Sequence, residues 1–327
     1  MAWTRKVLAT PRPGLARLLM AAGCAALLGL SSGTSGLAAP GARGNLVNVG
    51  SRAAPLRLWL EEAGSGEPIL FIHGLGANTY SWRHLAPSLA RTHHVLNVDL
   101  KGFGGSDKPV DEAYGVLDQA LLLATLIKRK RLKHLTIVGH SLGGGVALAL
   151  TGHLNLTEPD TVQRLVLLDS IAYRQPLPLF IALLRTPGLA DVGLLAAPPE
   201  LEVFKGLVAA YADPQIITLE AVRAYARPLY DRGGRHALTK TAQGIIPADL
   251  PTLIARYRSI RQPTLLLWCR QDRVVPLWVG RRLARTLPNA RLSLLEGCGH
   301  VPQEEVPAAT LGQIKAFLDA TAAARQP

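Results

Sequence analysis

The strongest constraint on the fold lies between residues 134 and 153, where a strand pattern passes into a helix pattern through a very short turn. His134–Gly139 is short and mostly apolar, which is typical of a buried strand. Leu142–His153 is rich in Ala and Leu, which favour helix. Because the glycine-rich turn between the two segments is so short, the helix must fold back onto the strand that precedes it.

Short apolar runs recur along the rest of the chain and alternate with helical patterns. Strands that alternate with helices predict an α/β fold, with a mainly parallel sheet covered by helices on both faces. The predicted strands span residues 56–60, 68–73, 94–100, 134–139, 164–169, 263–269 and 290–295. The clearest predicted helices span residues 117–132, 142–153 and 308–322.

The pattern changes between residues 171 and 261. This interval has no convincing strand, and prolines and glycines interrupt its several helical segments. We therefore expect residues 40–170 and 262–327 to form the core, and residues 171–261 to form an inserted helical cap. Such a cap would cover the carboxyl edge of the sheet, where open parallel sheets bind their ligands.

The short turn, Gly139-His140-Ser141-Leu142-Gly143, has the G-x-S-x-G pattern. At a strand–helix junction this turn presents the serine hydroxyl, and its glycines relieve the crowding of the backbone. The helix that begins at Leu142 adds its positive end, which stabilises a developing anion. The sequence therefore predicts that Ser141 is a nucleophile.

A nucleophilic serine needs a general base. His300 lies in a glycine-rich loop just after the last predicted strand, from where its imidazole can reach over the sheet edge to Ser141. Among the other histidines, we expect His140 to point away from the site. We expect His73, which precedes a glycine turn, to bond the backbone in a structural role.

The base needs a carboxylate that orients it. Asp272 follows the predicted strand that ends at Cys269 and precedes His300 by 28 residues, which leaves room for one helix and one strand. The three residues then follow one another in the order Ser, Asp, His. Asp169, at the end of an earlier predicted strand, is the alternative acid.

A tetrahedral intermediate needs two backbone donors for its oxyanion. The N–H group of Leu142, just after the nucleophile, is the first. The second is expected from the loop after the strand over residues 68–73, where glycines allow close approach of the backbone. We expect the N–H group of Leu75 to serve there, with Gly76 as the alternative.

Together these residues resemble the α/β-hydrolase superfamily, in the capped branch of esterases, C–C bond hydrolases, haloperoxidases, dehalogenases and epoxide hydrolases. The matching stretches extend from about Leu56 to Leu318, and they are FIHGLGANTYSW, DLKGFGGSDKP, GHSLGGG, the Asp272 loop and GCGHVPQEEVP. The resemblance implies a Ser141–Asp272–His300 triad in a hydrolase without metal or cofactor.

The resemblance also implies roles for some flanking residues. Glu305 matches a position that tends to cap the last helix. A turn that is usually structural is matched by Asp99, Gly102, Gly104 and Ser106. Dehalogenases and epoxide hydrolases place an aspartate at the nucleophile position, so the serine of this chain disfavours both.

The principal functional hypothesis is a serine hydrolase that cleaves a carboxylic ester or a related acyl bond through an acyl-enzyme on Ser141. The alternatives are a C–C bond hydrolase and a non-catalytic small-molecule-binding protein, since a fold does not dictate a function. The apolar cap segments Leu177–Leu184 and Leu189–Leu195 would either line a pocket for an apolar substrate or pack on the sheet.

Residues 1–39 have the pattern of a secretory signal peptide. Four basic residues and no acid precede residue 18, and small residues lead to Ala38 and Ala39. The apolar run between them, Leu18–Leu30, is too short for the roughly 20 residues that span a bilayer. We therefore expect a periplasmic or secreted protein. A lipoprotein anchored through Cys24 is the alternative, because small residues precede that cysteine.

The formal net charge of +13 favours attraction to anionic envelope surfaces, although a merely solvated basic surface is the plainer interpretation. Aromatic residues make up only 5% and no nucleic-acid motif is present, so a nucleic-acid partner is not expected. After removal of the leader, the cysteines would be Cys269 and Cys298. A disulfide between them is compatible with an oxidising compartment, but we expect two buried free thiols.

The predicted leader, residues 1–39, allows a direct test of localisation. Expressed in a bacterium, the chain should leave the cytoplasm and lose about 38 or 39 residues at a small-residue site. N-terminal sequencing decides the outcome. A mature chain that begins at a lipid-modified Cys24 would favour the lipoprotein alternative, and an intact Met1 would contradict both.

Overall fold

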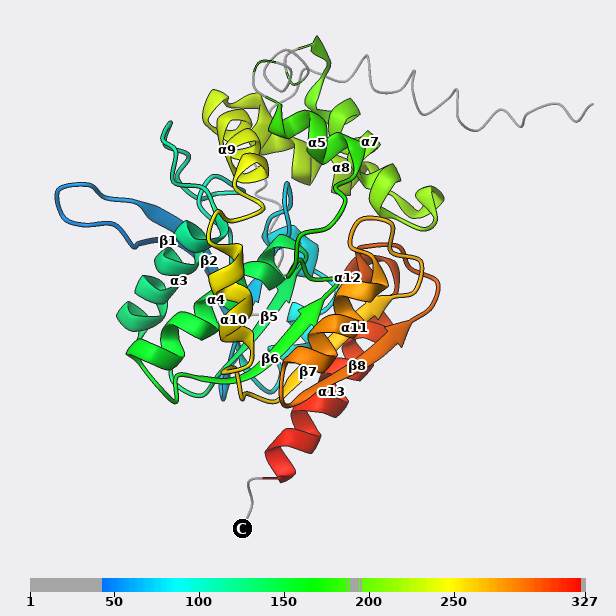
Figure 1. Cartoon of the computed structure of the whole chain (residues 1–327). Coiled ribbons are helices and arrows are strands. Elements are labelled where there is room, and N and C mark those ends of the chain that lie inside the picture. Colours follow the sequence, from blue (N-terminus) through cyan, green and yellow to red (C-terminus); the bar gives the residue numbers. More distant parts are fainter. Residues whose placement is uncertain (1–42, 187, 189–193, 195, 325–327) are drawn as a thin grey trace, which may run out of the picture. The chain divides into compact units, whose positions relative to one another are not determined.

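The computed structural model describes residues 43–324, apart from 187, 189–193 and 195 (Figure 1). The predicted leader and Cys24 therefore lie outside the described residues. In the described part, eight strands form one sheet in the order β1-β2-β4-β3-β5-β6-β7-β8. The β1/β2 and β2/β4 pairs are antiparallel, and all other pairs are parallel. The predicted α/β fold with a mainly parallel sheet is confirmed.

The strands lie close to their predicted positions. They are β1 Arg43–Asn48, β2 Arg57–Ala63, β3 Pro68–Ile72, β4 His94–Val98, β5 Leu135–His140, β6 Val162–Leu168, β7 Thr264–Cys269 and β8 Ala290–Leu295. Strand β1 was not predicted, because its sequence RGNLVN lacks the apolar pattern of a buried strand. This strand forms at the sheet edge because its backbone pairs with β2.

Helices connect most of the strands. The α-helices are α2 Ala86–Leu89, α3 Val116–Lys130, α4 Leu142–Thr157, α5 Leu179–Arg185, α7 Pro199–Ala210, α8 Leu219–Ala226, α9 Arg232–Gln243, α10 Leu250–Tyr257, α11 Leu277–Thr286, α12 Pro302–Glu305 and α13 Pro307–Ala323. The 3₁₀ helices are η1 Thr79–Trp82, η2 Pro214–Ile216 and η3 Arg227–Tyr230. In the part of the chain that the structure describes, no helix is both long and apolar enough to cross a membrane.

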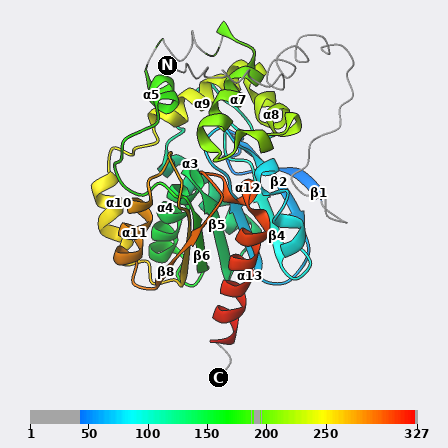
Figure 2. The same ribbon diagram turned by 90° about the vertical axis from the view of Figure 1, so that its right-hand side faces the viewer.

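The central strands are apolar throughout because both faces of the sheet are covered. Leu70 and Ile72 of β3 belong to an apolar layer shared with α3, α4 and α11. Their neighbours Ile69 and Phe71 point the other way and pack with α2 and α13. Figure 2 shows α10 and α11 on one side of the sheet and α13 on the other.

The interval predicted as a cap is helical wherever it is described. Between β6 and β7 it holds α5, α7, α8, α9 and α10 with the short turns η2 and η3, and none of its described residues forms a strand. The last of these helices, α10, packs beside α4 on a face of the sheet. The end of α7 instead lies against the loop after β8, and helix α9 lies against the loop after β3.

The turn after β4 supports the backbone, as the resemblance implied. The carboxylate of Asp99 accepts N–H bonds from Thr79 and Gly105, both at 2.7 Å. The hydroxyl of Ser106 donates to the carbonyl of Asp99 at 2.6 Å. This turn therefore fixes η1, and with it the loop that follows β3.

His73 has the structural role that was expected of it. Its Nδ1 lies 2.8 Å from the carbonyl oxygen of Gly74, and its Nε2 accepts the N–H of Leu100 at 3.0 Å. Burial lowers the pKa of this imidazole to about 4, so the ring is neutral at pH 7. A neutral ring can donate from one nitrogen and accept at the other, which these two contacts require.

Candidate active site

Ser141 lies at the junction of β5 and α4, in a strained turn. Its φ of 52° lies in the left-handed region, which is unfavourable for a residue with a side chain. The surroundings are crowded, because a Cβ on Gly143 would lie 2.2 Å from the carbonyl oxygen of Ile72. A Cβ on Gly139 would lie 2.5 Å from the carbonyl oxygen of Gly143. Glycine at both positions is therefore what permits the turn that presents the hydroxyl.

His300 follows β8 and meets the serine. Its Nε2 lies 2.9 Å from Oγ of Ser141. Its own backbone is bonded on both sides, because its N–H donates to the carbonyl of Ala210 at 2.8 Å. Its carbonyl accepts from Nε2 of His140 at 2.7 Å. The imidazole thus extends over the sheet edge from a firmly bonded loop.

His140 was expected to point away from the site, and that prediction is wrong. Its ring centroid lies 4.9 Å from that of His300, and its Nε2 bonds the carbonyl of His300. Burial, followed by the nearby His300, lowers the pKa of His140 well below 6.5. The ring is therefore neutral, with its proton on Nε2, and this N–H group holds the backbone carbonyl of His300 in place.

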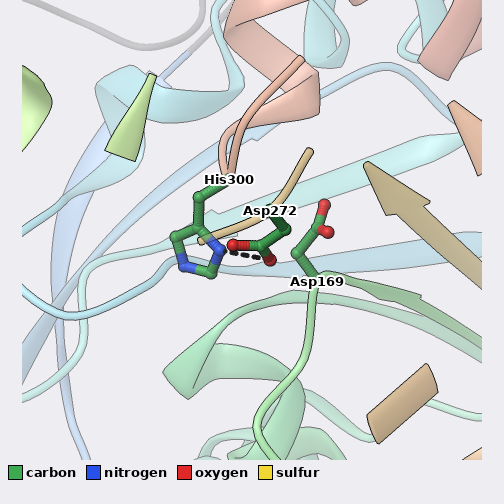
Figure 3. A group of neighbouring side chains, drawn as sticks. All are labelled: Asp169, Asp272 and His300. Carbon is green, nitrogen blue, oxygen red and sulfur yellow. Dashed lines mark hydrogen bonds and ion pairs between the residues drawn. The ribbon is translucent and has the colours of Figure 1, made fainter. Parts of the chain in front are cut away.

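Asp272 completes the chain of contacts (Figure 3). Its Oδ2 lies 2.9 Å from Nδ1 of His300. Its Oδ1 accepts the backbone N–H groups of Val274 at 2.7 Å and Val275 at 3.0 Å. Its side chain is fully buried. The ends of β5, β7 and β8 therefore bring Ser141, Asp272 and His300 into a single run of hydrogen bonds.

The alternative acid, Asp169, lies beside this pair and makes no hydrogen bond to the imidazole (Figure 3). Its Oδ1 accepts the N–H of Cys269 at 2.9 Å. One oxygen of each carboxyl group and one nitrogen of His300 lie within 4.8 Å of one another. Burial, followed by the charge of Asp272, raises the pKa of Asp169 well above 3.8, which favours its neutral form. Asp272 therefore occupies the position of the orienting acid.

Glu305 was expected to cap the last helix, and the structure contradicts this. The N-terminus of α13 has no side-chain cap. The carboxylate of Glu305 instead accepts the N–H of Gly299 at 2.9 Å and that of Val301 at 2.9 Å. It also accepts the N–H of Ala212, beyond α7, at 2.7 Å. Glu305 therefore fixes the backbone on both sides of the base and bonds it to the predicted cap.

A second buried carboxylate, Glu304, joins the same two parts of the chain. Its oxygens lie 2.6 Å from a guanidinium nitrogen of Arg83 and 3.0 Å from the hydroxyl of Ser81. It also accepts the hydroxyls of Tyr211 at 3.0 Å and Tyr225 at 2.5 Å. Burial, followed by Glu304, raises the pKa of Tyr225 well above 10, so this hydroxyl is a neutral donor. This cluster was not predicted, because its tyrosines lie far from Glu304 in the sequence.

The predicted oxyanion donors lie on two loops that meet at the nucleophile. Because β3 and β5 are neighbouring parallel strands, the loop after β3 lies against Ser141. A Cβ on Gly74 would lie 3.3 Å from the Cβ of Ser141. The N–H groups of Leu75 and Gly76 follow within this turn. Leu142 is the first residue of α4, so its N–H has no acceptor within the helix.

The site is closed. Ser141 is 7% exposed and His300 is 5% exposed. A Cβ on Gly299 would lie 2.3 Å from the carbonyl oxygen of Ala210, so the end of α7 covers the base loop. Leu238 of α9 lies over the turn after β3, 3.7 Å from the position of a Cβ on Gly76. The predicted cap thus contacts two of the loops that form the site.

Two cavities lie beside α10. The larger, of about 110 Å³, lies between α3, α4 and α10, and its lining includes no triad residue. The smaller, of about 30 Å³, is lined by Gly145 and Ile171, whose N–H groups both donate to the carbonyl of Ser141. Its remaining lining is almost entirely apolar. An apolar recess therefore adjoins the backbone of the nucleophile turn.

The cap segments that were expected to line a pocket are only partly inward-facing. In α5, Ile181 is buried, whereas Leu179 is 74% exposed and Leu183 is 48% exposed. Most of Leu189–Leu195 lies outside the described residues. The part of the small recess that comes from the end of the predicted cap is instead formed by Ile245, Ile246 and neighbouring residues after α9.

The two cysteines are not free thiols, contrary to expectation. Cys269 and Cys298 form a disulfide with their Cα atoms 5.4 Å apart. Both are fully buried, as predicted. They pair because Cys269 ends β7 and Cys298 follows β8, and these strands are neighbours in the sheet.

Comparisons with known proteins agree with this fold. A model of the alpha/beta hydrolase family matches residues 69–313. The 2-hydroxymuconate semialdehyde hydrolase of Pseudomonas sp. strain CF600 is 29% identical over 287 residues, 83% of this chain and 94% of that protein. A putative acyltransferase from Salmonella enterica has a TM-score of 0.72 and 26% identity, covering 86% of this chain and 97% of that chain.

A third similarity concerns the fold alone. A thermophilic esterase from Thermogutta terrifontis has a TM-score of 0.68 and 21% identity, covering 85% of this chain and 99% of that chain. The chain belongs to the alpha/beta hydrolase family, as the sequence motifs predicted. Its curated relatives include several hydrolases.

Substitution of the two aspartates tests which of them orients His300. Asp272→Asn should lower kcat by up to about four orders of magnitude with little change in KM, because an amide cannot hold the correct tautomer of His300. Asp169→Asn should have a small effect, because a neutral amide resembles the neutral carboxyl group. Steady-state kinetics on a simple ester compare the two matched variants. The reverse ranking would move the orienting acid to the end of β6.

Proposed function

We propose that the protein is a serine hydrolase that cleaves a carboxylic ester or a related acyl bond through an acyl-enzyme on Ser141. The observation that carries this proposal is the run of hydrogen bonds from Ser141 through His300 to Asp272, each 2.9 Å long. A serine bonded to an imidazole that is itself bonded to a buried carboxylate is the arrangement that activates a hydroxyl for attack on a carbonyl carbon.

The first half of the reaction forms the acyl-enzyme. Nε2 of His300 accepts the hydroxyl proton while Oγ of Ser141 attacks the carbonyl carbon of the substrate. The carboxylate of Asp272 stabilises the imidazolium that forms. The imidazolium then donates its proton to the departing alkoxide, and the alcohol leaves. In the second half, His300 activates a water molecule in the same way, and the acid is released.

The oxyanion of each tetrahedral intermediate needs donors that are already in place. The N–H of Leu142 is one such donor in this proposal, and the N–H of Leu75 or Gly76 is the other. The positive end of α4 adds to the same stabilisation.

Hydrolysis of a C–C bond is the second candidate. It is favoured by the similarity to the Pseudomonas hydrolase of 2-hydroxymuconate semialdehyde, which covers 94% of that protein. The same serine, base and acid would serve either reaction. A panel of p-nitrophenyl esters of graded chain length, assayed beside 2-hydroxymuconate semialdehyde, separates the two. A higher kcat/KM on the semialdehyde than on every ester would favour the C–C bond hydrolase.

Two substitutions test the nucleophile and the base. Ser141→Ala should lower kcat on p-nitrophenyl esters by roughly six orders of magnitude, because it removes the attacking atom. His300→Ala should lose a similar amount, and the double variant little more, because triad members act as a unit. The exposed Ser259 supplies the control, since Ser259→Ala should keep wild-type kinetics. Near-wild-type turnover by a folded Ser141→Ala variant would contradict the proposal.

A further inference from the structure

The disulfide joins the two loops that carry the orienting acid and the base. Cys269 is the last residue of β7 and stands three positions before Asp272. Cys298 stands two positions before His300. A short covalent path therefore connects Asp272 to His300 through Cys269, the sulfur–sulfur bond and Cys298. The side chains of Asp272 and His300 are also joined directly by a hydrogen bond of 2.9 Å.

The disulfide lies where regular pairing of the backbone ends. The last residue pair of β7 and β8 is Cys269 with Leu295, followed by one bond from the N–H of Arg270 to the carbonyl of Leu295. The base loop then leaves the sheet. Glu305 of α12 and the carbonyl of Ala210, in the predicted cap, both hold this loop. The disulfide holds it from the side of the sheet.

We propose that the Cys269–Cys298 disulfide is a positioning element that sets the distance between Asp272 and His300. The proposal rests on the proposed function, because it assigns a role within the same triad. Two unbonded thiol sulfurs cannot approach as closely as two bonded ones. Both sulfurs are buried in a close-packed apolar cluster, so separating them would displace the two loops. A displacement of about 1 Å can cost roughly 100-fold in rate.

The test is the double variant Cys269→Ala, Cys298→Ala. We expect kcat on a p-nitrophenyl ester to fall by about 10- to 100-fold while KM stays within about twofold. The downfield proton resonance of the Nδ1–H group between His300 and Asp272 should broaden or disappear. Leu295→Ala, which removes a buried side chain from the same apolar cluster, is the control and should lower Tm while keeping both readouts.

Reduction provides an independent test, because it breaks the sulfur–sulfur bond and leaves both sulfur atoms in place. Dithiothreitol would transfer two electrons and two protons to the disulfide, giving two thiols and the oxidised reagent. The loss of kcat should return when the sulfur–sulfur bond forms again. If the double alanine variant does not fold, Cys269→Val with Cys298→Ala restores most of the lost apolar volume and takes its place.

The outcomes separate the role of the disulfide from the proposed hydrolase function. An unchanged kcat and an unchanged downfield resonance, with a lower Tm, would show that the disulfide only stabilises the fold. Failure of Ser141→Ala to abolish activity would overturn the proposed function. The resonance would still test the disulfide in that case, because it requires no turnover.

A second and independent observation is the distribution of charge. Between Leu250 and Leu295 the chain has nine arginines and a single acid, the buried Asp272, so this segment carries most of the formal net charge of +13. All nine arginines are exposed. Among the described residues, the only carboxylate paired with any of them is Glu296, which pairs with Arg270 at 2.6 Å.

Five of these arginines, here called the arginine face, lie in α11 or at the C-terminal end of α10: Arg256 in α10, Arg258 directly after it, and Arg281, Arg282 and Arg285 in α11. Tyr173 joins the two helices, because its ring lies 5.9 Å from that of Tyr257 at the end of α10 and 6.5 Å from that of Trp278 in α11. The guanidinium of Arg282 stacks over Tyr173 at 4.1 Å. Trp278 is 40% exposed and lies on the same helical face as the arginines of α11.

We propose that the arginine face docks on an anionic phospholipid surface. Guanidinium groups bind phosphate in a bidentate manner, and an exposed tryptophan beside them suits the interface between headgroups and acyl chains. Exposed guanidinium groups, three of them on the helical face of one exposed indole, match a surface of repeating phosphates with an apolar layer beneath it. The face has a single exposed aromatic side chain, which does not favour the successive base stacking used with single-stranded nucleic acid.

Co-sedimentation with vesicles tests this docking. The wild-type chain should bind equimolar phosphatidylglycerol and phosphatidylcholine, should not bind phosphatidylcholine alone, and should dissociate as salt rises. Arg256→Gln, Arg281→Gln and Arg285→Gln together should weaken binding roughly 100-fold, at about fivefold for each charge. Ester hydrolysis in solution should stay unchanged.

The control removes the same charge elsewhere, from three exposed cations outside the arginine face. Arg91→Gln, Lys128→Gln and Arg131→Gln together should weaken binding far less than the triple variant of the arginine face. An equal loss in the control would show that net charge alone drives binding and would overturn the proposal. Binding to double-stranded DNA but not to anionic vesicles would overturn it in favour of a nucleic-acid partner.

Discussion

The hydrogen bonds to the backbone of His300 are the interactions on which the rest of the site depends. His300 lies in a loop beyond β8, so no helix or strand fixes its position. Its N–H is bonded to Ala210 and its carbonyl to His140, while Glu305 bonds the N–H groups of its two neighbours. These bonds hold the loop so that the imidazole lies 2.9 Å from both a hydroxyl and a carboxylate.

The same contacts make the predicted cap part of the active site. The carbonyl of Ala210 and the N–H of Ala212 both bond the base loop or its carboxylate. Tyr211 and Tyr225 donate to Glu304, whose other partners lie beside η1. A movement of the chain after α7 would therefore break hydrogen bonds that position the base loop.

The sequence predicted the features that local patterns determine. The strand, turn and helix around Ser141 are adjacent in the chain, and the parallel order of β5, β6, β7 and β8 brings their following loops to one edge. His140 and Glu304 were misassigned or missed because their partners lie far away in the sequence. Glu305 was misassigned because it bonds the base loop that precedes it, and not the helix that follows. The disulfide could not be predicted either, because Cys269 and Cys298 meet only when β7 and β8 are neighbours in the sheet. The polar strand β1 forms because β2 offers it a free edge.

Labelling with a fluorophosphonate shows whether Ser141 is an activated nucleophile. The reagent forms a stable bond with a serine whose hydroxyl is activated by a neighbouring base. We expect one equivalent of label on the intact protein, located by peptide mapping on the peptide that contains Ser141 and abolished in Ser141→Ala. Absence of labelling in the folded wild-type chain, or equal labelling of Ser141→Ala, would mean that Ser141 is not the activated nucleophile.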